Sequence, residues 1–356
     1  MIKVIDARDL TTRHTAAWEE IRASNPNLRS PYFSPSFTRL VAAVRTDVRV
    51  AIIGKSSDPT AFFPFQVGRW RLGRPVGGAL SDYHGPIASH DLALDIPELI
   101  ARCGLAVWDF DHVPVAQREF APHAKVQSHS PYMDLKRGYE AYCEQVRASG
   151  SKQVNKIGTL FRKLEREQGS LRFVMDTTDD LLLTRLMALK SDQYRESGTV
   201  DAFAYGWTRQ LLRAIHETKE DGFAGLLSAL YLGDEPIALH FGMRSKDIIH
   251  YWFPVYSANY AKFSPGLILL LKMAEQAPAC GIRQIDLGKG DTMYKQRLMS
   301  GKTELLEGSV ETPSLVKHCR SALSAWEKCM AKIPVQGLRT LPSRLQGRME
   351  RRRRFL

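Results

Sequence analysis

The sequence has 356 residues, of which 44% are hydrophobic and 25% are charged, so it can form two domains with buried cores. Its formal net charge of +12 favours anionic partners such as nucleotides, coenzyme A, RNA or an acidic membrane surface. The five cysteines are scattered and lack C-x-x-C spacing, which argues against a disulfide framework and a zinc site.

The start of the chain, MIKVIDARDLTT, has no apolar segment typical of a signal peptide. The longest aliphatic run, near GLILLL, is far shorter than the roughly 20 residues that span a bilayer. We therefore expect a cytoplasmic protein, with peripheral contact to the inner membrane as an alternative.

The first part of the chain alternates short strands and helices. A strand at 48–54 and its hairpin partner at 61–70 flank a turn, and a helix at 94–106 leads into a strand at 107–114. The stretch 129–135 closes this part as a further strand. The pattern predicts a first α/β domain over residues 1–135.

The second part repeats this alternation over residues 136–311. Apolar residues at helical spacing predict helices that are listed here by their ranges: 151–169, 179–198, 204–220 and 264–281. Alternation and tight turns predict strands at 171–176, 224–232, 235–244, 247–255 and 282–287, the middle three forming an antiparallel meander. This order predicts one compact α/β domain with a mixed sheet.

The two parts share a short motif. Phe-Ser-Pro opens a predicted helix in both YFSPSFTRLVAAV (32–44) and KFSPGLILLLKMA (262–274). Serine is a favoured N-cap and proline fits the first helical position, so the motif indicates either helix capping or a duplicated domain.

The last part, 312–356, is predicted to be an amphipathic helix followed by a basic tail. Residues 337–356 carry seven arginines and one glutamate, a net charge of +6. The tail is either a solubilising extension, an anchor to an acidic membrane, or a site for a phosphate-bearing nucleotide. Its candidate anion-binding residues are Arg348, Arg351, Arg352, Arg353 and Arg354.

The stretch DLGKGDTMYKQRL (286–298) is the leading site candidate. Two glycines follow a buried strand, and ligands of α/β sheets gather where strands end. Asp291 can accept a proton and Tyr294 can donate one, whereas Lys295 and Arg297 can hold phosphate or carboxylate groups. The alternative is an ordinary helix start that Asp291 caps.

A second candidate is the helix start at Ser264, Pro265 and Gly266. It follows a strand, and the free N–H groups and positive dipole of a helix start suit a pyrophosphate. A plain helix cap by Ser264 is the alternative.

Further candidates contact the substrate. Asp82, Tyr83 and His84 lie in the glycine-bracketed loop GGALSDYHGPIA, where a structured turn is the alternative. No metal site is predicted, because no partner of His84 has ligand spacing. His250 and Tyr251 alternate on one strand, so one of them faces any cleft in the sheet. The remaining candidates are His240, Tyr251 and, on the basic helix at 151–169, Arg162 and Lys163.

Several catalytic motifs are missing from the sequence. It contains no G-x-S-x-G, H-E-x-x-H or P-loop, and no G-x-G-x-x-G at a strand exit. Their absence argues against serine hydrolases, zinc proteases and nucleotide-dependent kinases.

Residues 139–310 resemble the acetyltransferase domain of the CelD/BioF2-like group, within the GNAT superfamily and near the FemABX peptidyltransferases. The resemblance rests on SKQVNKIGTLFRKLEREQG, EPIALHFGMR, YWFPVYSANYAKFSPGLILLL and IDLGKGDTMYKQRL. The first 130 residues look like the first GNAT-like half of such proteins. The implied fold is two GNAT-like α/β domains in tandem with a basic C-terminal extension.

The resemblance implies an acyl-CoA-dependent N-acyltransferase of bacterial exopolysaccharide or envelope synthesis, with acetyl-CoA as cofactor and an amino sugar or glycan as acceptor. The helix start at Ser264 to Gly266 would then face the pyrophosphate, with Lys295 and Arg297 as further cofactor contacts. Asp291 and Tyr294 would lie near the acceptor as base and acid.

The sequence departs from the GNAT pattern at the phosphate loop, Arg/Gln-x-x-Gly-x-Gly/Ala, of which SANYAKFSPG keeps only Gly266. FemABX relatives use aminoacyl-tRNA, so the donor stays open between acetyl-CoA and an aminoacyl-tRNA, with tRNA the second choice. Some relatives respond to cyclic di-GMP, which the arginine-rich tail would bind. A non-catalytic module that responds to nucleotides or membranes is the third alternative.

Overall fold

The structure, a computed structural model, describes residues 1–55 and 57–314. The predicted tail residues Arg348 and Arg351 to Arg354 lie outside the described residues. In the described part of the chain, no helix is both long enough and apolar enough to cross a membrane.

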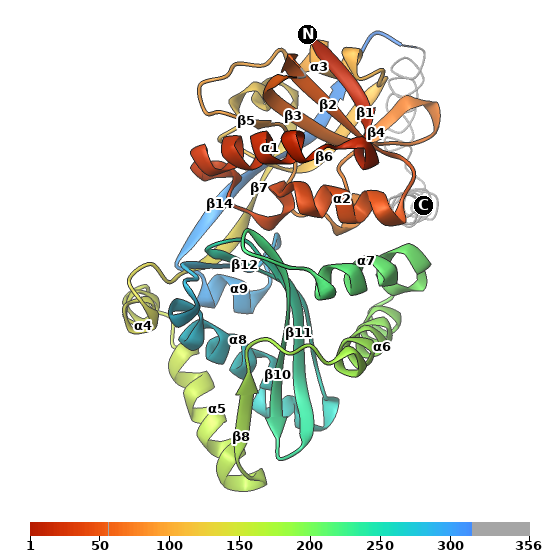
Figure 1. Ribbon diagram of the computed structural model, residues 1–356. Coiled ribbons are helices and arrows are strands. Elements are labelled where there is room, and N and C mark those ends of the chain that lie inside the picture. The colour runs from red at the N-terminus through yellow and green to blue at the C-terminus, as the bar shows by residue number, and fades with distance from the viewer. Residues whose placement is uncertain (56, 315–356) are drawn as a thin grey trace, which may run out of the picture.

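The N-terminal half, in red to yellow in Figure 1, contributes seven strands and the helices that cover them. The strands are β1 (Ile2–Asp6), β2 (Val48–Lys55), β3 (Asp58–Val67), β4 (Leu72–Arg74), β5 (Ile87–Ala88), β6 (Val107–Pro114) and β7 (Ala124–Asp134). The α-helices are α1 (Thr12–Ser24), α2 (Pro35–Val44) and α3 (Ile96–Arg102).

The C-terminal half, in yellow to blue, confirms the predicted element order. Its helices are α4 (Tyr139–Ala148), α5 (Gln153–Gln168), α6 (Asp180–Glu196), α7 (Gly206–Glu217), α8 (Pro265–Gln276) and α9 (Met293–Leu298). Its strands are β8 (Leu171–Val174), β9 (Lys219–Glu220), β10 (Phe223–Leu232), β11 (Glu235–Arg244), β12 (Ile248–Tyr256), β13 (Gln284–Asp286) and β14 (Gly301–Glu311).

Local chemistry accounts for the helix ends. The side chain of Asp179 accepts hydrogen bonds from the N–H groups of Leu181 and Leu182 and so begins α6, and Gly169, at a φ of +117°, ends α5. The two Phe-Ser-Pro motifs differ. Ser34 caps α2 through its side chain, whereas Ser264 has a left-handed backbone and makes no side-chain cap.

The strands form one continuous sheet in the order β1-β2-β3-β4-β6-β14-β7-β13-β12-β11-β10-β8, with β5 and β9 at its margins. The last strand of each half has crossed to the other. β7 follows β6 in the chain but pairs with β13, and β14 follows α9 but pairs with β6. The two strands pair with each other as a long antiparallel ribbon that runs diagonally between the halves in Figure 1.

The halves also share a hydrophobic core. One cluster combines Trp18, Phe33 and Phe37 of the first half with Leu211 and Phe253 of the second. Helix α2 packs against α7 across this boundary (Figure 1). A second cluster lies between the C-terminal sheet and α4, α5 and α8, and a third lies within the first half. The predicted boundaries near 135 and 311 therefore fall within one continuous sheet, and β14, predicted for the second domain, lies beside β6.

Polar contacts join the same two surfaces. The guanidinium of Arg29 forms an ion pair with Asp247. Arg22 donates a hydrogen bond to the carbonyl of Gly222 at 3.2 Å, and Ser36 donates one to Glu220 at 2.5 Å. The first half is thus fixed against the α6/α7 side of the second.

The crossed strands predict a stability test. Leu305 on β14 is fully buried in the shared core, so Leu305→Ala should lower the free energy of unfolding by about 2–5 kcal/mol. Leu181 on α6 is 81% exposed, and Leu181→Ala serves as the matched control, with a change below about 0.5 kcal/mol. Denaturant unfolding, followed by tryptophan fluorescence and far-UV circular dichroism, measures both. Two separate transitions in the wild type would contradict a shared core.

Candidate active site at the junction of the two halves

The site lies where two neighbouring strands separate. β12 and β13 are parallel and pair through three positions, the last of which joins His250 to Asp286. Beyond this pair β12 continues to Tyr256, whereas the chain after β13 turns away through Gly288 and Gly290. The loop 81–84 of the first half contacts this point of separation.

Three side chains there form a buried ionic chain. Nε2 of His250 lies 2.9 Å from Oδ2 of Asp82, and Nδ1 lies 3.6 Å from Oδ1 of Asp286. The His250 and Asp286 side chains are 1% and 4% exposed, whereas that of Asp82 keeps 23% of its surface. Asp82 is therefore the open end of a carboxylate–imidazole–carboxylate chain that joins the halves.

The titration behaviour of this chain follows from its geometry. Burial opposes the charge of His250, but the adjacent carboxylates of Asp286 and Asp82 outweigh it and raise its pKa to about 9. Burial likewise opposes ionisation of Asp82, but the His250 contact and the charge of His112 lower its pKa to about 2. Despite burial, contacts with His250, Tyr83 and Ser130 lower the pKa of Asp286. At neutral pH the chain is an imidazolium between two carboxylates.

Asp286 is held by donors from three segments. Its carboxylate accepts hydrogen bonds from the hydroxyl of Tyr83 at 2.5 Å, the hydroxyl of Ser130 at 2.7 Å and the N–H of Gly288 at 2.8 Å. A buried carboxylate requires such partners, because its desolvation is costly. Asp286 is therefore a fixed structural charge rather than a group that contacts substrate.

Gly288 gives the site its space. Its φ is +73°, and a Cβ atom there would lie 3.1 Å from Oδ2 of Asp82 and 3.6 Å from the His250 ring. Glycine tolerates this left-handed backbone and leaves the carboxylate open. The ammonium of Lys295 donates to the carbonyls of Gly288 at 2.9 Å and Lys289 at 3.0 Å, which holds the loop in place.

A bulge in β12 orients the aromatic wall of the site. The register pairs Met243 with His250 but Phe241 with Phe253, so β12 has one extra residue there. Trp252 lies on the same side as His250 by ordinary alternation, and the extra residue adds Phe253 to that side. Tyr32 of the first half contacts the rings of His250 and Trp252 edge-on, with centroid distances of 5.0 Å and 5.8 Å. Tyr251 lies on the opposite face, towards α8.

A second histidine approaches Asp82 from β6. Nε2 of His112 lies 3.6 Å from Oδ1 of Asp82, and Nδ1 lies 3.0 Å from Oδ1 of Asp111. Nε2 of His84 accepts hydrogen bonds from the N–H groups of Asp111 at 3.1 Å and His112 at 3.0 Å. Burial lowers the pKa of His84 to about 3, so its ring stays neutral.

His84, Asp111 and His112 also offer ligand atoms within 4.8 Å of one another. Two amides already occupy the Nε2 lone pair of His84, which leaves that nitrogen unable to bind a metal. We therefore assign these residues to hydrogen bonding.

The structure places the other predicted residues around this centre. Tyr83 and Asp82 belong to it, as described. Asp291 is 68% exposed and lies 3.3 Å from Nε2 of His129. Tyr294 packs on the α8 face, where burial raises its pKa to about 12. The Arg297 side chain is exposed, and its backbone carbonyl accepts a hydrogen bond from Ser151.

The predicted helix start at Ser264 lies on the α8 face. Ser264 has a φ of +54°, which is strained for a non-glycine residue, and its carbonyl accepts the N–H groups of Leu267 and Ile268. The Tyr251 hydroxyl donates to the carbonyl of Gly266 at 3.4 Å, and its ring stacks on His240 with 4.2 Å between centroids. Pro265 is buried at the first position of α8.

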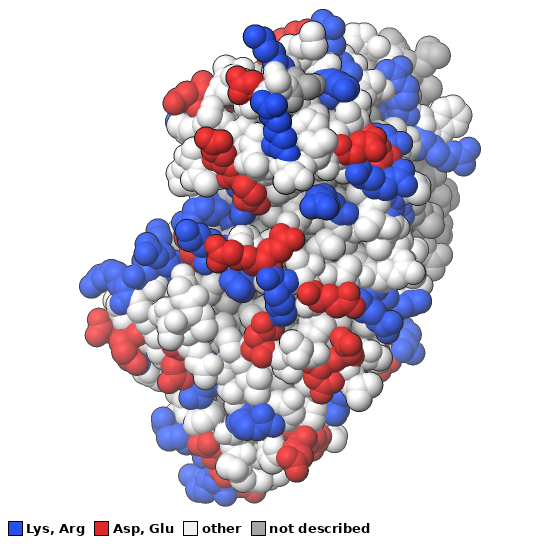
Figure 2. All heavy atoms as spheres, in the orientation of Figure 1, with Lys and Arg blue, Asp and Glu red and all other residues white. Residues whose placement is uncertain are grey.

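Arg162 lines a surface cavity of about 360 Å³ between α4, α5 and α8, together with Arg147 and Lys272. Figure 2 shows Lys and Arg side chains gathered on the left of the molecule, over the region of α4. Lys163 does not line this cavity and lies 3.8 Å from Glu167 on the same helix. Neither residue is near the ionic chain.

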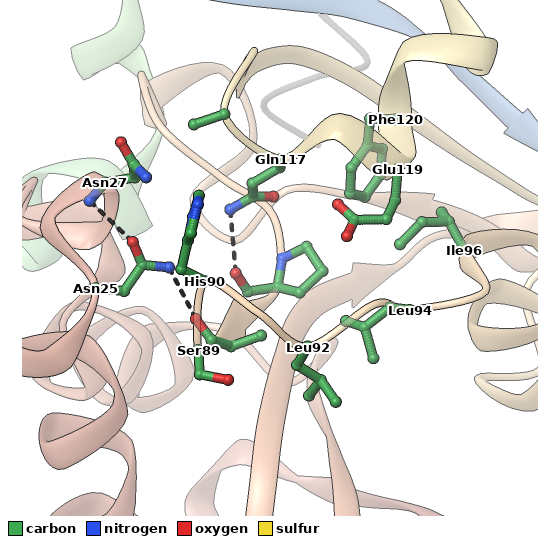
Figure 3. Close-up of a pocket in the computed structure, with 13 residues that line it drawn as sticks. Asn25, Asn27, Ser89, His90, Leu92, Leu94, Ile96, Gln117, Glu119 and Phe120 are labelled. Carbon is green, nitrogen blue, oxygen red and sulfur yellow. Dashed lines mark hydrogen bonds between the residues drawn. The ribbon is translucent and has the colours of Figure 1, made fainter.

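A small cavity in the first half is shown in Figure 3. Part of its polar lining is already bonded. Asn25 donates to the carbonyl of Ala88 at 2.9 Å and accepts from the N–H of Asn27 at 3.0 Å, and Gln117 donates to the carbonyl of Pro86 at 3.1 Å. A volume of about 40 Å³ suits one or two water molecules rather than a substrate.

Sequence reasoning left His250 as one of two alternatives and did not name four members of the site: Asp286, Tyr32, Ser130 and His112. Strand alternation indicated that either His250 or Tyr251 faces a cleft, and His250 is the one that meets Asp82. No local pattern indicates Ser130, which is separated from Asp286 by 156 residues.

The ionic chain predicts how stability depends on pH. The pKa of His250 rises from 6.5 to about 9, so its stabilisation is fully present below pH 6.5 and is lost as the pH rises through 9. The lowered pKa of Asp82 contributes stability above about pH 4 that is lost as the pH falls towards 2. Between pH 6.5 and 9 the free energy of unfolding should therefore fall by at most about 1.4 kcal/mol per pH unit.

His250→Gln should remove this alkaline fall, while His90→Gln, at an exposed loop position, should keep it. Denaturant unfolding at several pH values measures both variants against the wild type. Parallel curves for His250→Gln and the wild type would show that His250 is not held as an imidazolium.

Comparisons with known proteins agree with this architecture. Residues 151–296 match the acetyltransferase (GNAT) domain family. No curated protein matches the chain. Among solved structures, FemX is similar to this chain at 11% sequence identity and a TM-score of 0.56. The match covers 86% of this chain and 96% of the FemX chain.

A second similar structure is the C-terminal domain of a putative lysylphosphatidylglycerol synthetase from Agrobacterium fabrum, at 11% identity and a TM-score of 0.52. The match covers 89% of this chain and 95% of that domain's chain. A conserved protein of unknown function from Bacteroides thetaiotaomicron covers 87% and 98%, at 13% identity and a TM-score of 0.52. At such identities these likenesses concern the fold. The predicted α/β, GNAT-like fold class is confirmed, and the domain match supports the predicted enzyme class, an acyltransferase.

Proposed function

We propose that this chain is an N-acyltransferase whose acceptor amine binds at Asp82, where β12 and β13 separate. The observation that carries the proposal is the buried ionic chain of Asp82, His250 and Asp286. A carboxylate that is ionised by its surroundings and partly open to solvent suits a cationic amine.

The two faces of the sheet suggest separate entries for donor and acceptor. The α8 face carries the strained Ser264, Tyr251 and Tyr294, and we assign it to the acyl donor. The opposite face carries Asp82, Trp252 and Tyr32, and we assign it to the acceptor. The reacting groups would meet through the gap between the strands.

The chemistry needs little from the protein beyond placement. The neutral amine attacks the acyl carbonyl, the carbon–nitrogen bond forms, and the carbon–sulfur bond to the thiolate breaks. Asp82 binds and orients the amine. Tyr294 remains the predicted acid for the thiolate, since its raised pKa keeps the hydroxyl protonated at neutral pH.

We take acetyl-CoA as the donor and an amino sugar of an exopolysaccharide or lipid-linked glycan as the acceptor. This follows the sequence resemblance to the CelD/BioF2-like group and the match of residues 151–296. Regulation by cyclic di-GMP or by a membrane rests on the basic tail, which lies outside the described residues.

Transfer from an aminoacyl-tRNA is the second candidate. Two observations favour it: the missing phosphate loop around Gly266 and the likeness to FemX over most of the chain. The basic side chains near α4 would suit RNA.

Isothermal titration separates the two donors. If acetyl-CoA is the donor, the purified chain should bind it with a micromolar Kd. The same titration with an aminoacyl-tRNA should then give weak binding that falls steeply with salt, as for nonspecific phosphate contacts. No binding of acetyl-CoA together with tight binding of the tRNA would replace the first donor by the second.

The role of Asp82 is tested by kinetics. With acetyl-CoA and glucosamine as probes, Asp82→Asn should lower kcat/KM by about 10²-fold or more, because the amine loses its charged partner. Asp91→Asn, at an exposed position in the same half, should change it less than about twofold. The sequence predicts a similar loss for Asp291→Asn, and release of the CoA thiol measures all three. Wild-type turnover in Asp82→Asn would remove Asp82 from the site.

A further inference from the structure

His112 lies between two carboxylates that differ in their geometry towards it. Its Nδ1 is at hydrogen-bond distance from Oδ1 of Asp111, 3.0 Å, whereas its Nε2 is 3.6 Å from Oδ1 of Asp82. The first contact fixes a proton on Nδ1, because a carboxylate accepts and the ring nitrogen must then donate. In the neutral ring Nε2 is therefore an acceptor, 3.6 Å from Oδ1 of Asp82.

Two acceptors thus face each other across 3.6 Å, a separation that is too long for a direct hydrogen bond. One amine nitrogen with two N–H groups can donate to both at about 2.9 Å. The His112 and Asp82 side chains remain 11% and 23% exposed, so the position between them is open to a ligand.

We propose that His112 is the base of the acyl transfer, and that the acceptor amine binds between its Nε2 and Oδ1 of Asp82. Asp111 is a positioning residue that holds the Nδ1 proton. The inference rests on the proposed acyl transfer to an amine. In this proposal the first half supplies both groups that contact the amine, His112 and Asp82.

His250 cannot take this role, because its side chain is only 1% exposed and its Nε2 lies 2.9 Å from Oδ2 of Asp82, a distance at which the ring donates a hydrogen bond to that carboxylate. The His112 side chain is 11% exposed, and its Nε2 is 3.6 Å from the same carboxylate. The two histidines on either side of Asp82 are therefore not equivalent. The buried ring of His250 fixes Asp82, whereas Nε2 of His112 is open to the amine.

His84 supports this arrangement through the backbone. Its Nε2 accepts the N–H groups of both Asp111 and His112, although His84 lies 27 residues away in the chain. The ring thereby fixes the end of β6 that carries the base. The predicted substrate residue His84 is in this proposal a positioning residue.

The proton balance is simple. The amine arrives as an ammonium and gives one proton to Nε2 of His112. The freed nitrogen lone pair forms the carbon–nitrogen bond, and the carbon–sulfur bond breaks with its electron pair going to the thiolate. The imidazolium returns its proton to solvent beside Asp111, whose side chain is 27% exposed. The second N–H proton leaves the nitrogen as the amide forms and passes to the thiolate through Tyr294 or solvent.

The charged and titratable groups around His112 include Asp111, Asp82, His84 and His250. Lys289 donates to the Asp111 carbonyl at 3.1 Å and pairs with Glu307 at 2.7 Å, and the charge of Lys295 acts on Asp82.

The tautomer can be measured without knowing the acceptor. Long-range ¹H–¹⁵N NMR spectra of the ¹⁵N-histidine-labelled full chain report the protonated nitrogen of each ring, and His112→Gln assigns the signal. We expect a neutral His112 with its proton on Nδ1 near pH 8, and Asp111→Asn should move the proton to Nε2. A proton on Nε2 in the wild type, or an imidazolium up to pH 9, would overturn the proposal.

Kinetics with acetyl-CoA and glucosamine give the second measurement. His112→Gln should lower kcat/KM by about 10²-fold at neutral pH, and the deficit should narrow about tenfold per pH unit as the free amine accumulates. A merely structural role would give the same deficit at every pH, which would overturn the proposal. His90→Gln, in the same half, is the control and should match the wild type.

The two proposals fail in different ways. If Asp82→Asn loses activity while His112→Gln keeps it, acyl transfer at Asp82 stands and His112 is not its base. If the wild type transfers no acyl group to any amine, the NMR measurement still decides whether His112 has a free Nε2 lone pair.

Discussion

The ionic chain from Asp82 through His250 to Asp286 is the interaction on which the site depends. Its members come from a loop of the first half and from two strands of the second, and all three charges are largely withdrawn from water. Removing one partner of such a set leaves an uncompensated buried charge, which costs about 3–5 kcal/mol. The halves therefore cannot move apart at this point without exposing or neutralising the charges. Asp82 belongs to the first half and is held by His250 of the second half. The contact between the halves therefore sets the geometry of the acceptor position.

The exchange of strands gives this contact its rigidity. β7 leaves the first half to pair with β13, and Ser130 on β7 binds the same carboxylate that β13 carries. β14 returns to pair with β6, the strand that carries Asp111 and His112. The two histidines that flank Asp82 are thus both connected to the ribbon of β7 and β14, His250 through Asp286 and His112 through β6. The shared core around Phe33 and Phe253 adds a second, apolar connection, so neither half forms the complete site alone.

Much of the architecture was predictable from the sequence, because helices and strands depend on local spacing. The strand at 107–114 and the helix ended by Gly169 are where the pattern placed them. The loop at Asp82 and Tyr83 was also found, since glycines and polar residues mark it. What could not be predicted depends on distant pairing. Alternation left His250 and Tyr251 equivalent, and only the packing of the first half on one face of β12 decides which one meets Asp82. Ser264 read as a normal cap, but its left-handed backbone reflects the turn after β12 rather than local preference.

The presence of two histidines at one carboxylate follows from what each must do. A group that fixes Asp82 in its ionised form must be charged at neutral pH, and the carboxylates of Asp286 and Asp82 raise the pKa of His250 to about 9. A group that accepts a proton must be uncharged before the reaction, and no imidazole can be both. His112 has its Nδ1 3.0 Å from Asp111, whereas its Nε2 is 3.6 Å from Asp82 and its side chain is 11% exposed. His250 has its Nε2 2.9 Å from Asp82 and is 1% exposed, so close contact with Asp82 and exclusion from solvent separate a structural cation from a candidate base.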